Sequence, residues 1–519
     1  MKRTDIVFLF HFHLPYVYHP EAGYFEENWY YQNLAESYIP FLMMMEDLAN
    51  NTMVPSVTIS LSPTLCYMME NEKMADRFVS YINSRISLIE SERSIINDEK
   101  IHRILDIYEK RYVDVLDYFE RYSRDILTPF KLLKSRGIIE IITTPLTYPI
   151  LPLLTISQAL NFQITEACRD FSERFLERNL GMFLPECGWS FEIEKFLLKN
   201  NIEYIFLDER ALEDDPPNSL YQLESGIRIF TPDHKIFDFL FGKDGVTRNP
   251  NYREFYRDIG YERDLSYLSK YTGCSFHAPT GLKYSKITGV DLPIEKKQIY
   301  DAEIASRTLK DDVERFVNFL LSYCDGSSSK LLTFISSAEI FGHRWFEGID
   351  FLKNFFIYVR KNRLPLNFVL PSSYIKMVLS PKVIKPSISS WSDNGFFDKW
   401  LNERNDFIYP YIHEISKKFI SVASRYRNLS FSPEIDRILR QAVREISLMQ
   451  SSDWAIMIST STHREYALKR INEHYMNVMK IIKWLLSGGL DREELSRMEK
   501  RLPIFPFIGW KNFLSLSQM

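Results

Sequence analysis

The segment Gly181–Trp189 places one carboxylate at a point where enzymes often carry a catalytic group. Glu186 follows a short apolar run and a proline, and an amphipathic helical pattern begins just after it. This order predicts a strand, a tight turn and a helix, with Glu186 on the turn. Barrel enzymes keep their catalytic groups at the C-terminal ends of strands. Glu186 could therefore act as a nucleophile or as a general acid or base, the alternative being an isolated surface glutamate.

Two histidines end the first predicted strand, at residues 5–10. His11 and His13 point to the same side, because side chains alternate along a strand. This spacing can bind a metal when a third ligand is supplied from elsewhere. No third ligand is evident in the sequence, so we favour two hydrogen-bonding histidines that line a polar pocket.

A third polar segment, residues 336–348, follows a predicted strand and carries Glu339, His343 and Trp345. A retaining glycosidase needs two carboxylates about 5 Å apart, one as nucleophile and one as acid/base. The turn at 337–339 is the expected source of a partner for Glu186. Tryptophan faces can stack on sugar rings. Four tryptophans could do so, one or two of which we expect in the core instead: Trp345, Trp391, Trp400 and Trp454.

Composition narrows the class of protein. A length of 519 residues predicts two to four domains. The 64 basic and 68 acidic residues nearly balance, which gives no electrostatic case for nucleic acid or an anionic membrane. Five scattered cysteines without a Cys-x-x-Cys pair predict reduced thiols in a cytoplasmic protein. No run of 18 apolar residues is present, so no membrane span is expected.

The hydrophobic pattern predicts an α/β fold. Continuous apolar runs are typical of strands buried on both faces of a parallel sheet, and helical patterns lie between most of them. Strand signals, several of which are continuous apolar runs, lie at 5–10, 54–61, 138–143, 182–184, 204–207, 227–230 and 331–335.

Two further segments read as helical. Apolar residues recur at spacings of three and four between 65 and 135, and helical patterns return at 394–425, 433–450 and 462–486, beyond a Pro/Ser-rich hinge. We therefore expect a barrel (1–64 and 136–385), a helical insertion (65–135) and a C-terminal helical domain (386–519).

Eight motifs give the chain a resemblance to glycoside hydrolase family 57, and within it to α-1,4-glucan branching enzyme-like members. The resemblance runs nearly end to end. The motifs lie at 10–21 (FHFHLPYVYHPE), 140–153, 183–187 (FLPEC), 252–260 (YREFYRDIG), 280–284 (TGLKY), 338–348 (AEIFGHRWFEG), 389–391 and 450–454 (QSSDW).

The resemblance implies a (β/α)7-type barrel with a helical insertion and a C-terminal all-helical domain. It places Glu186 at the nucleophile position and implies an α-1,4-glucan partner and no metal. We expect no cofactor, and the composition already gave no reason to expect nucleic acid or a membrane as a partner. A monomer or small homo-oligomer is expected. The positions that it marks for substrate binding are His11, His13, Trp29, Tyr148, Trp189, His343, Trp345, Trp391, Trp400, Asp453 and Trp454.

The chain also departs from the family pattern around this site. Ser337 stands where the acid/base aspartate is expected, and Tyr148 where a substrate-binding histidine is usual. Arg344 replaces a tryptophan, and the loop between Phe241 and Tyr252 is short.

A serine has no useful pKa for protonating a glycosidic oxygen, and general acid/base help contributes about 10²–10⁴ in rate. Glu339 and Asp208 are weak candidates for a replacement acid. We therefore expect strongly impaired or absent branching activity. The alternative is a non-catalytic protein that binds α-glucan or a protein partner.

Overall fold

The structure is a computed structural model that describes residues 3–21, 25–51, 55–324, 331–428 and 432–515. A ten-stranded sheet forms its centre: nine strands follow the order β10-β6-β7-β5-β4-β3-β2-β1-β8, and β9 pairs with β1 beside this path. Residue 54, the expected start of the second strand, lies outside the described residues. The parallel strands of the curved sheet are β1 (Thr4–Phe12), β2 (Val57–Leu61), β3 (Ile139–Thr143), β4 (Gly181–Met182), β5 (Tyr204–Phe206), β7 (Arg228–Phe230) and β8 (Leu331–Ser337).

The sheet curves into a barrel. Within the described residues, β7 and β8 face each other across the remaining gap without pairing as strands. Beyond β7, the amide of Asp233 donates a hydrogen bond to the carbonyl of Thr333 on β8, at 3.1 Å. The α/β barrel class predicted from the apolar runs is confirmed. Three short strands lie outside the predicted runs and were not expected: β6 (Tyr221–Gln222), β9 (Leu366–Phe368) and β10 (Lys382–Val383).

Strand register sets the positions of the chemically interesting residues. His11 on β1 is aligned with Ser60 on β2 and with Ser337 on β8. Because these strands are parallel, their C-terminal ends meet at one edge of the barrel. The turn that carries Glu186 follows β4 at the same edge.

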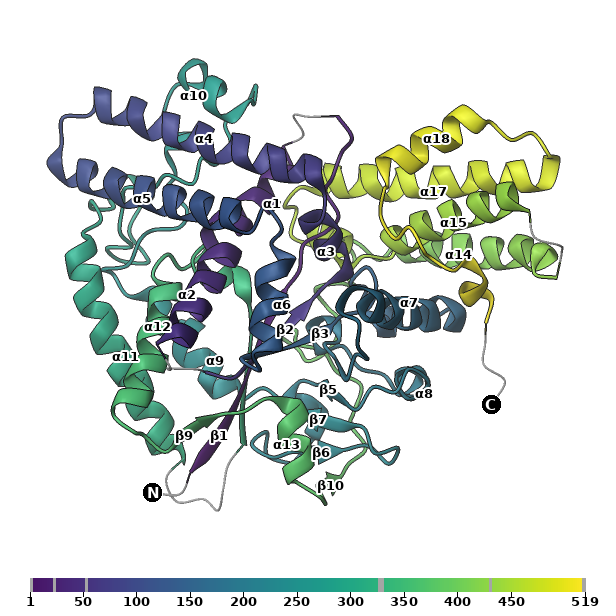
Figure 1. The fold of residues 1–519 in the computed structure, drawn as a ribbon, viewed down its shortest axis with the longest axis horizontal. Coiled ribbons are helices and arrows are strands. Elements are labelled where there is room, and N and C mark those ends of the chain that lie inside the picture. The colour runs from purple at the N-terminus through teal and green to yellow at the C-terminus, as the bar shows by residue number, and fades with distance from the viewer. Residues whose placement is uncertain (1–2, 22–24, 52–54, 325–330, 429–431, 516–519) are drawn as a thin grey trace.

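Helices cover the outside of the barrel (Figure 1). A π-helical turn, Leu34–Tyr38, joins the first two helices. The helices of the barrel region are α1 (Glu27–Asn33), α2 (Ile39–Asn50), α7 (Ser157–Phe175), α8 (Phe191–Lys199), α9 (His234–Phe241), α10 (Leu265–Thr272), α11 (Ala302–Cys324), α12 (Gly348–Lys361) and α13 (Pro371–Met377).

Four helices fill the segment expected to be a helical insertion: α3 (Pro63–Met69), α4 (Glu72–Ile95), α5 (Glu99–Arg121) and α6 (Leu127–Ser135). The two long ones, α4 and α5, lie side by side across the molecule (Figure 1). Asn71 and Asp98 begin them by accepting hydrogen bonds from backbone amides of the first turn.

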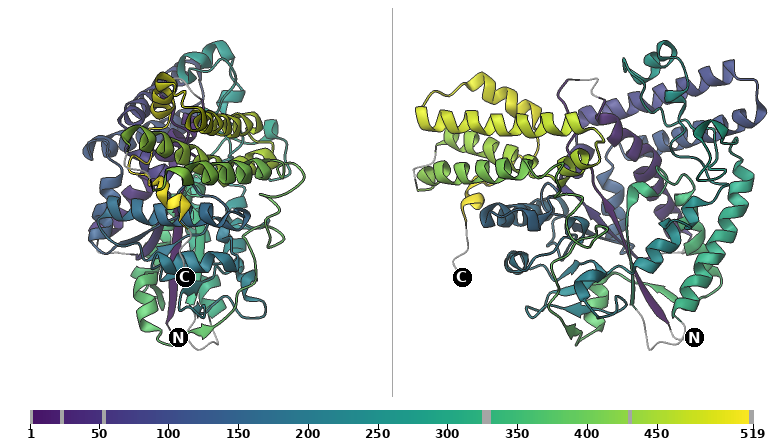
Figure 2. Two further views of the ribbon diagram at one scale, coloured as in Figure 1. Left: turned by 90° about the vertical axis from the view of Figure 1, so that its right-hand side faces the viewer. Right: turned by 180° about the vertical axis from the view of Figure 1, so that it is seen from behind.

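A separate group of helices, coloured green to yellow, projects from the barrel near its upper edge (Figure 2). They are α14 (Ile408–Ala423), α15 (Pro433–Met449), α16 (Ser452–Ser459), α17 (Arg464–Ser487) and α18 (Arg492–Arg501). The domain boundaries inferred above stay a prediction. Within the described part of the chain, no helix is long and apolar enough to cross a membrane.

One helix prediction is wrong at its start. The pattern at 394–425 yields helix only from Ile408, and residues 394–407 form turns. Side chains there bond to the backbone instead: the amide of Asn402 donates to the carbonyl of Asp398, and that of Asn405 to the carbonyl of Lys399. Such local bonds compete with the helical ladder.

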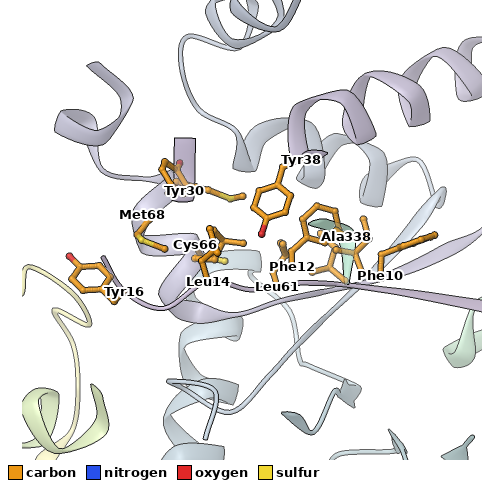
Figure 3. Packing of buried hydrophobic residues seen from close by; sticks show 14 of the residues in the cluster. Phe10, Phe12, Leu14, Tyr16, Tyr30, Tyr38, Leu61, Cys66, Met68 and Ala338 are labelled. Atoms are coloured by element: carbon orange, nitrogen blue, oxygen red, sulfur yellow. The ribbon is translucent and has the colours of Figure 1, made fainter. Parts of the chain in front are cut away.

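The hydrophobic core fixes the segment that leaves β1. Phe10 and Phe12 pack with Tyr38 and with Ala338, while Leu14 and Tyr16 continue the packing toward α3 (Figure 3). Alternate residues of this segment are therefore held in the core. His11 and His13, which lie between them, are turned to the opposite side, toward the centre of the barrel mouth.

Candidate active site

A cavity of about 690 Å³ opens at the C-terminal ends of the barrel strands. Its wall is built from four parts of the chain: the strand ends of the barrel with the turns that follow them, the start of α9, the turns at 391–400 and the start of α16. It brings together Glu186 and Ser337, the two positions that the sequence singled out. Its other polar lining residues are His11, His13, Tyr148, Arg210, His234, Asp238, Glu339, Arg344, Ser392, Asp393, Lys399, Ser452 and Asp453.

Glu186 is presented by a strained turn. Glu186 and Cys187 both have positive φ, 54° and 53°, which costs on the order of 1–3 kcal/mol for each non-glycine residue. The turn is held in place by main-chain bonds, from Cys187 N to the Leu184 carbonyl at 2.9 Å and from Trp391 N to the Glu186 carbonyl at 2.7 Å. The strand, turn and helix predicted around this residue are present as β4, the 3-10 turn and α8.

The carboxyl group of Glu186 has its pKa raised to about 7. Burial is the main cause, because it disfavours the charged form. Asp453 and Glu339 raise the pKa further, whereas Lys399 and the Tyr148 hydroxyl lower it. That hydroxyl has no hydrogen bond of full geometry to any described residue, yet it lies close enough to the carboxylate to favour its charged form.

Ser337 is the last residue of β8 and is half-buried in the cavity wall. It cannot supply a titratable proton near neutral pH. The next side chain on this wall is Glu339, whose Oε1 lies 3.5 Å from an Arg344 guanidinium nitrogen. Glu186 and Ser337 thus face one cavity, and the second position carries no carboxylate.

His13 joins the barrel to the C-terminal helices. Its Nδ1 lies 2.9 Å from the Ser62 hydroxyl, and its Nε2 lies 3.0 Å from Asp453 Oδ2. The ring also stacks on Tyr148, with centroids 3.7 Å apart. The His13 imidazole therefore contacts three segments that are distant in sequence, those of Ser62, Tyr148 and Asp453.

His11 is neutral and packs against an aromatic ring. Burial, and then the neighbouring His13, lower its pKa to about 3. Its ring stacks on Phe183 at 5.1 Å, and its Nδ1 has no partner among the described residues. The described part of the chain holds no cluster of three His, Cys, Asp or Glu residues that could bind a metal ion.

Asp208, one weak candidate for a replacement acid, lies behind the cavity wall. It is fully buried and accepts hydrogen bonds from His234 Nε2 at 2.9 Å and from Arg210 Nε at 2.7 Å. Burial raises its pKa, but these two donors outweigh that effect and leave the pKa lowered. Asp208 is therefore ionised, and its hydrogen bonds fix the positions of His234 and Arg210, which line the cavity.

Two of the candidate tryptophans line the cavity. Trp391 is half-buried and meets Phe237 edge to face at 5.4 Å, and Trp400 lies close by on the same loop. Trp189 and Trp454 are fully buried, and the Trp454 indole donates a hydrogen bond to the Leu448 carbonyl at 2.8 Å. Burial leaves these two indoles no free face for a sugar.

The remaining candidates lie outside the cavity wall. Trp29 packs against His463 at 4.6 Å. His343 lies 2.8 Å from a carboxylate oxygen of Glu36 through its Nδ1. Trp345 is buried beside Phe351 and lines a neighbouring cavity instead.

Several lining residues were missed by reasoning from the sequence. Asp393 and Lys399, which form an ion pair at 3.1 Å, come from the turns at 391–400. Phe237 and Asp238 come from α9. Phe237 and Asp238 could have been predicted, because α9 directly follows a strand. Asp393 and Lys399 could not, because only the three-dimensional path of their loop brings them to the cavity.

Comparison with known proteins gives a consistent result over the whole chain. A family model described as glycosyl hydrolase family 57 matches residues 7–387, and one described as 1,4-alpha-glucan branching enzyme, C-terminal, matches residues 411–513. A 1,4-alpha-glucan branching enzyme of Thermococcus kodakarensis is 25% identical over 535 residues, which covers 96% of this chain and 76% of that relative.

Solved structures agree with the sequence matches. The α-amylase AmyC of Thermotoga maritima has a TM-score of 0.90 at 30% identity, covering 99% of this chain and 100% of that one. A GH57-type branching enzyme of Pyrococcus horikoshii has a TM-score of 0.89 at 25% identity, covering 100% of this chain and 98% of that one.

Proposed function

The chain belongs to glycosyl hydrolase family 57, and from that premise we propose that it is a branching enzyme-like protein that binds α-1,4-glucan but branches it poorly or not at all. One observation carries this proposal. Glu186 faces the cavity from the end of β4, whereas the residue facing it from the end of β8 is Ser337. A retaining double displacement uses two carboxylates. In this proposal Glu186 supplies one, and Ser337 occupies the position of the other.

Glu186 is the proposed nucleophile. In its ionised form it attacks the anomeric carbon, a covalent glucosyl-enzyme forms, and the chain then passes to water or to a glucan 6-hydroxyl. The departing glycosidic oxygen needs a proton in the first step, and the incoming hydroxyl must lose one in the second. Ser337 can perform neither transfer efficiently, so both steps lose about 10²–10⁴ in rate.

The other carboxylates of the cavity are poor substitutes for the missing acid. Asp453 is engaged by His13 at 3.0 Å and by the Ser451 hydroxyl at 2.5 Å. Asp393 is exposed and paired with Lys399. Glu339 lies beside Arg344 on the β8 side, and we regard it as the strongest of these weak candidates.

Binding of α-glucan is supported by the shape and lining of the cavity. A volume of about 690 Å³ lies within the range of small-molecule sites, roughly 300–1,000 Å³. Trp391 supplies aromatic surface, whereas Trp400 is 5% exposed and supplies little, and His13 and Asp453 supply polar groups held in fixed positions. We propose these residues, with His11 and Tyr148, as the sugar contacts.

A second candidate function is a non-catalytic glucan-binding protein. It is supported by the engagement of two other carboxylates of the cavity, Asp453 by His13 and Asp393 by Lys399, which leaves neither free to act as the missing acid. The two candidates share the same binding site and differ only in turnover.

An amylose assay separates them, with iodine staining and reducing-end analysis of wild type, Glu186→Gln and Ser337→Asp. We expect little or no branching by wild type, none by Glu186→Gln and a gain for Ser337→Asp. Robust wild-type branching that disappears in Glu186→Gln contradicts impaired catalysis. An inactive Ser337→Asp variant that still retains amylose in affinity electrophoresis supports the non-catalytic candidate.

A further inference from the structure

A second cavity, of about 320 Å³, lies beside the catalytic cavity. The two share Ile340 and Arg344 in their walls, so they are neighbours across the loop that follows β8. The rest of the second cavity comes from the end of α9 and from residues 247–256 and 287–297. Nothing in the proposed double displacement uses this space.

Two buried donors in its wall lack acceptors. Trp345 and Arg253 are each 3% exposed, and the indole Nε1 of the first and the guanidinium Nε of the second have no hydrogen-bond partner among the described residues. A buried donor without an acceptor is costly to the fold. Both atoms are shielded from the cavity space, so a ligand would meet the exposed groups at the rim of the cavity rather than these two donors.

The mouth of the second cavity carries excess positive charge. Lys297 is paired with Glu254 at 3.2 Å, and the charge of Arg253 is balanced by buried Glu347, whose carboxylate accepts from the Arg253 amide at 3.1 Å.

Two exposed arginines remain. Arg344 has only a 3.5 Å contact with Glu339, and the Arg248 side chain makes no ion pair within the described residues.

An aromatic ring stands at the same rim. Tyr256 is 70% exposed, lines the cavity and meets Phe255 edge to face at 5.1 Å. An exposed tyrosine is a suitable platform for a sugar ring. The rim therefore combines a sugar platform, Tyr256, with two exposed arginines, Arg248 and Arg344.

We propose that this second cavity binds the phosphate monoester of a sugar unit. A phosphate dianion offers three acceptor oxygens and matches the planar donor fork of arginine. The phosphate belongs either to a free sugar phosphate or to a phosphorylated glucose unit of a glucan chain that extends from the catalytic cavity. Binding of a phosphorylated glucan chain rests on the proposed α-glucan function, whereas binding of a free sugar phosphate does not.

Calorimetry on the full chain tests the site with glucose 6-phosphate, glucose and maltoheptaose as separate titrants. The variants are Arg344→Gln and Arg248→Gln. Arg363→Gln is the matched control, because Arg363 is an exposed arginine that lines a different cavity. Thermal unfolding of each variant checks that the fold is kept.

We expect glucose 6-phosphate to bind more tightly than glucose, each of the two variants to weaken it about tenfold, and the control to leave it unchanged. A maltoheptaose phosphorylated at one glucose unit that binds more tightly than glucose 6-phosphate assigns the phosphate to the glucan. Equal affinity for glucose and glucose 6-phosphate, or equal losses in Arg344→Gln and Arg363→Gln, overturns the inference. Maltoheptaose binding reports separately on the proposed function.

Discussion

The pKa of Glu186 makes the pH dependence of its reaction predictable. An α-maltosyl fluoride is the suitable substrate, because fluoride departs without a proton and the absence of an acid at Ser337 then does not limit the first step. The ionised carboxylate is the reactive form, so the rate of the first-turnover burst of fluoride release, before breakdown of the glycosyl-enzyme limits the steady state, should rise with pH through the pKa of Glu186, about 7. No descending limb is expected, since a serine does not titrate in this range.

The size of the effect follows from that pKa. The ionised fraction is about 1% at pH 5 and about 90% at pH 8, so the rate should rise roughly 90-fold between them. Lys399 lowers the pKa of Glu186. Lys399→Gln should therefore move the midpoint to higher pH and reduce the rate at pH 7, whereas Lys385→Gln, at an exposed lysine outside the cavity wall, should not.

Fluoride release measured with an ion-selective electrode from pH 5 to pH 9 provides the profile. A flat profile, or a midpoint near the ordinary glutamate value in wild type, refutes the reasoning. A midpoint that moves equally in the two lysine variants refutes the assigned role of Lys399.

Three other predictions concern neighbouring features. Asp453 raises the pKa of Glu186, so Asp453→Asn should shift the same profile to lower pH, opposite to the lysine variant. Trp345→Ala should destabilise the protein by about 3–5 kcal/mol in urea unfolding, because the indole is buried, whereas Trp391→Ala should weaken maltoheptaose binding with little change in stability. Gly342→Ala should cost more than Gly137→Ala in the same unfolding assay: at Gly342, where φ is 97°, a Cβ would lie 2.0 Å from a main-chain oxygen, whereas the Gly137 site, where φ is 69°, is open. Equal losses at the two glycines would contradict the steric account.

The barrel could be predicted from the sequence where its strands are long. β1, β2, β3 and β8 have five to nine residues each and are buried at nearly every position, so they are rich in apolar and β-branched residues and recognisable as strands. The short strand β6 pairs with both β7 and β10. It consists of Tyr221 and Gln222 alone, which belong to no apolar run, so the sequence did not indicate it.

The candidate site was predictable as far as strand ends define it. His11, Glu186 and Ser337 follow apolar runs, and parallel strands bring their C-terminal ends to one edge. Lys399 could not be placed, because its loop leaves the barrel and returns over the cavity. The tryptophans could not be sorted either, since burial depends on packing: Trp391 lines the cavity, whereas Trp454 lies in the core.

The central claim is that Glu186 is a competent nucleophile while the partner acid/base is missing. Mass spectrometry of the protein after incubation with α-maltosyl fluoride tests it most directly. Formation of the glycosyl-enzyme needs no acid with this substrate, but its breakdown needs a base, so the adduct should accumulate. We predict a maltosyl adduct on the peptide containing Glu186 in wild type, none in Glu186→Gln and a short-lived one in Ser337→Asp. An adduct on another carboxylate, or its absence from wild type, would contradict the account.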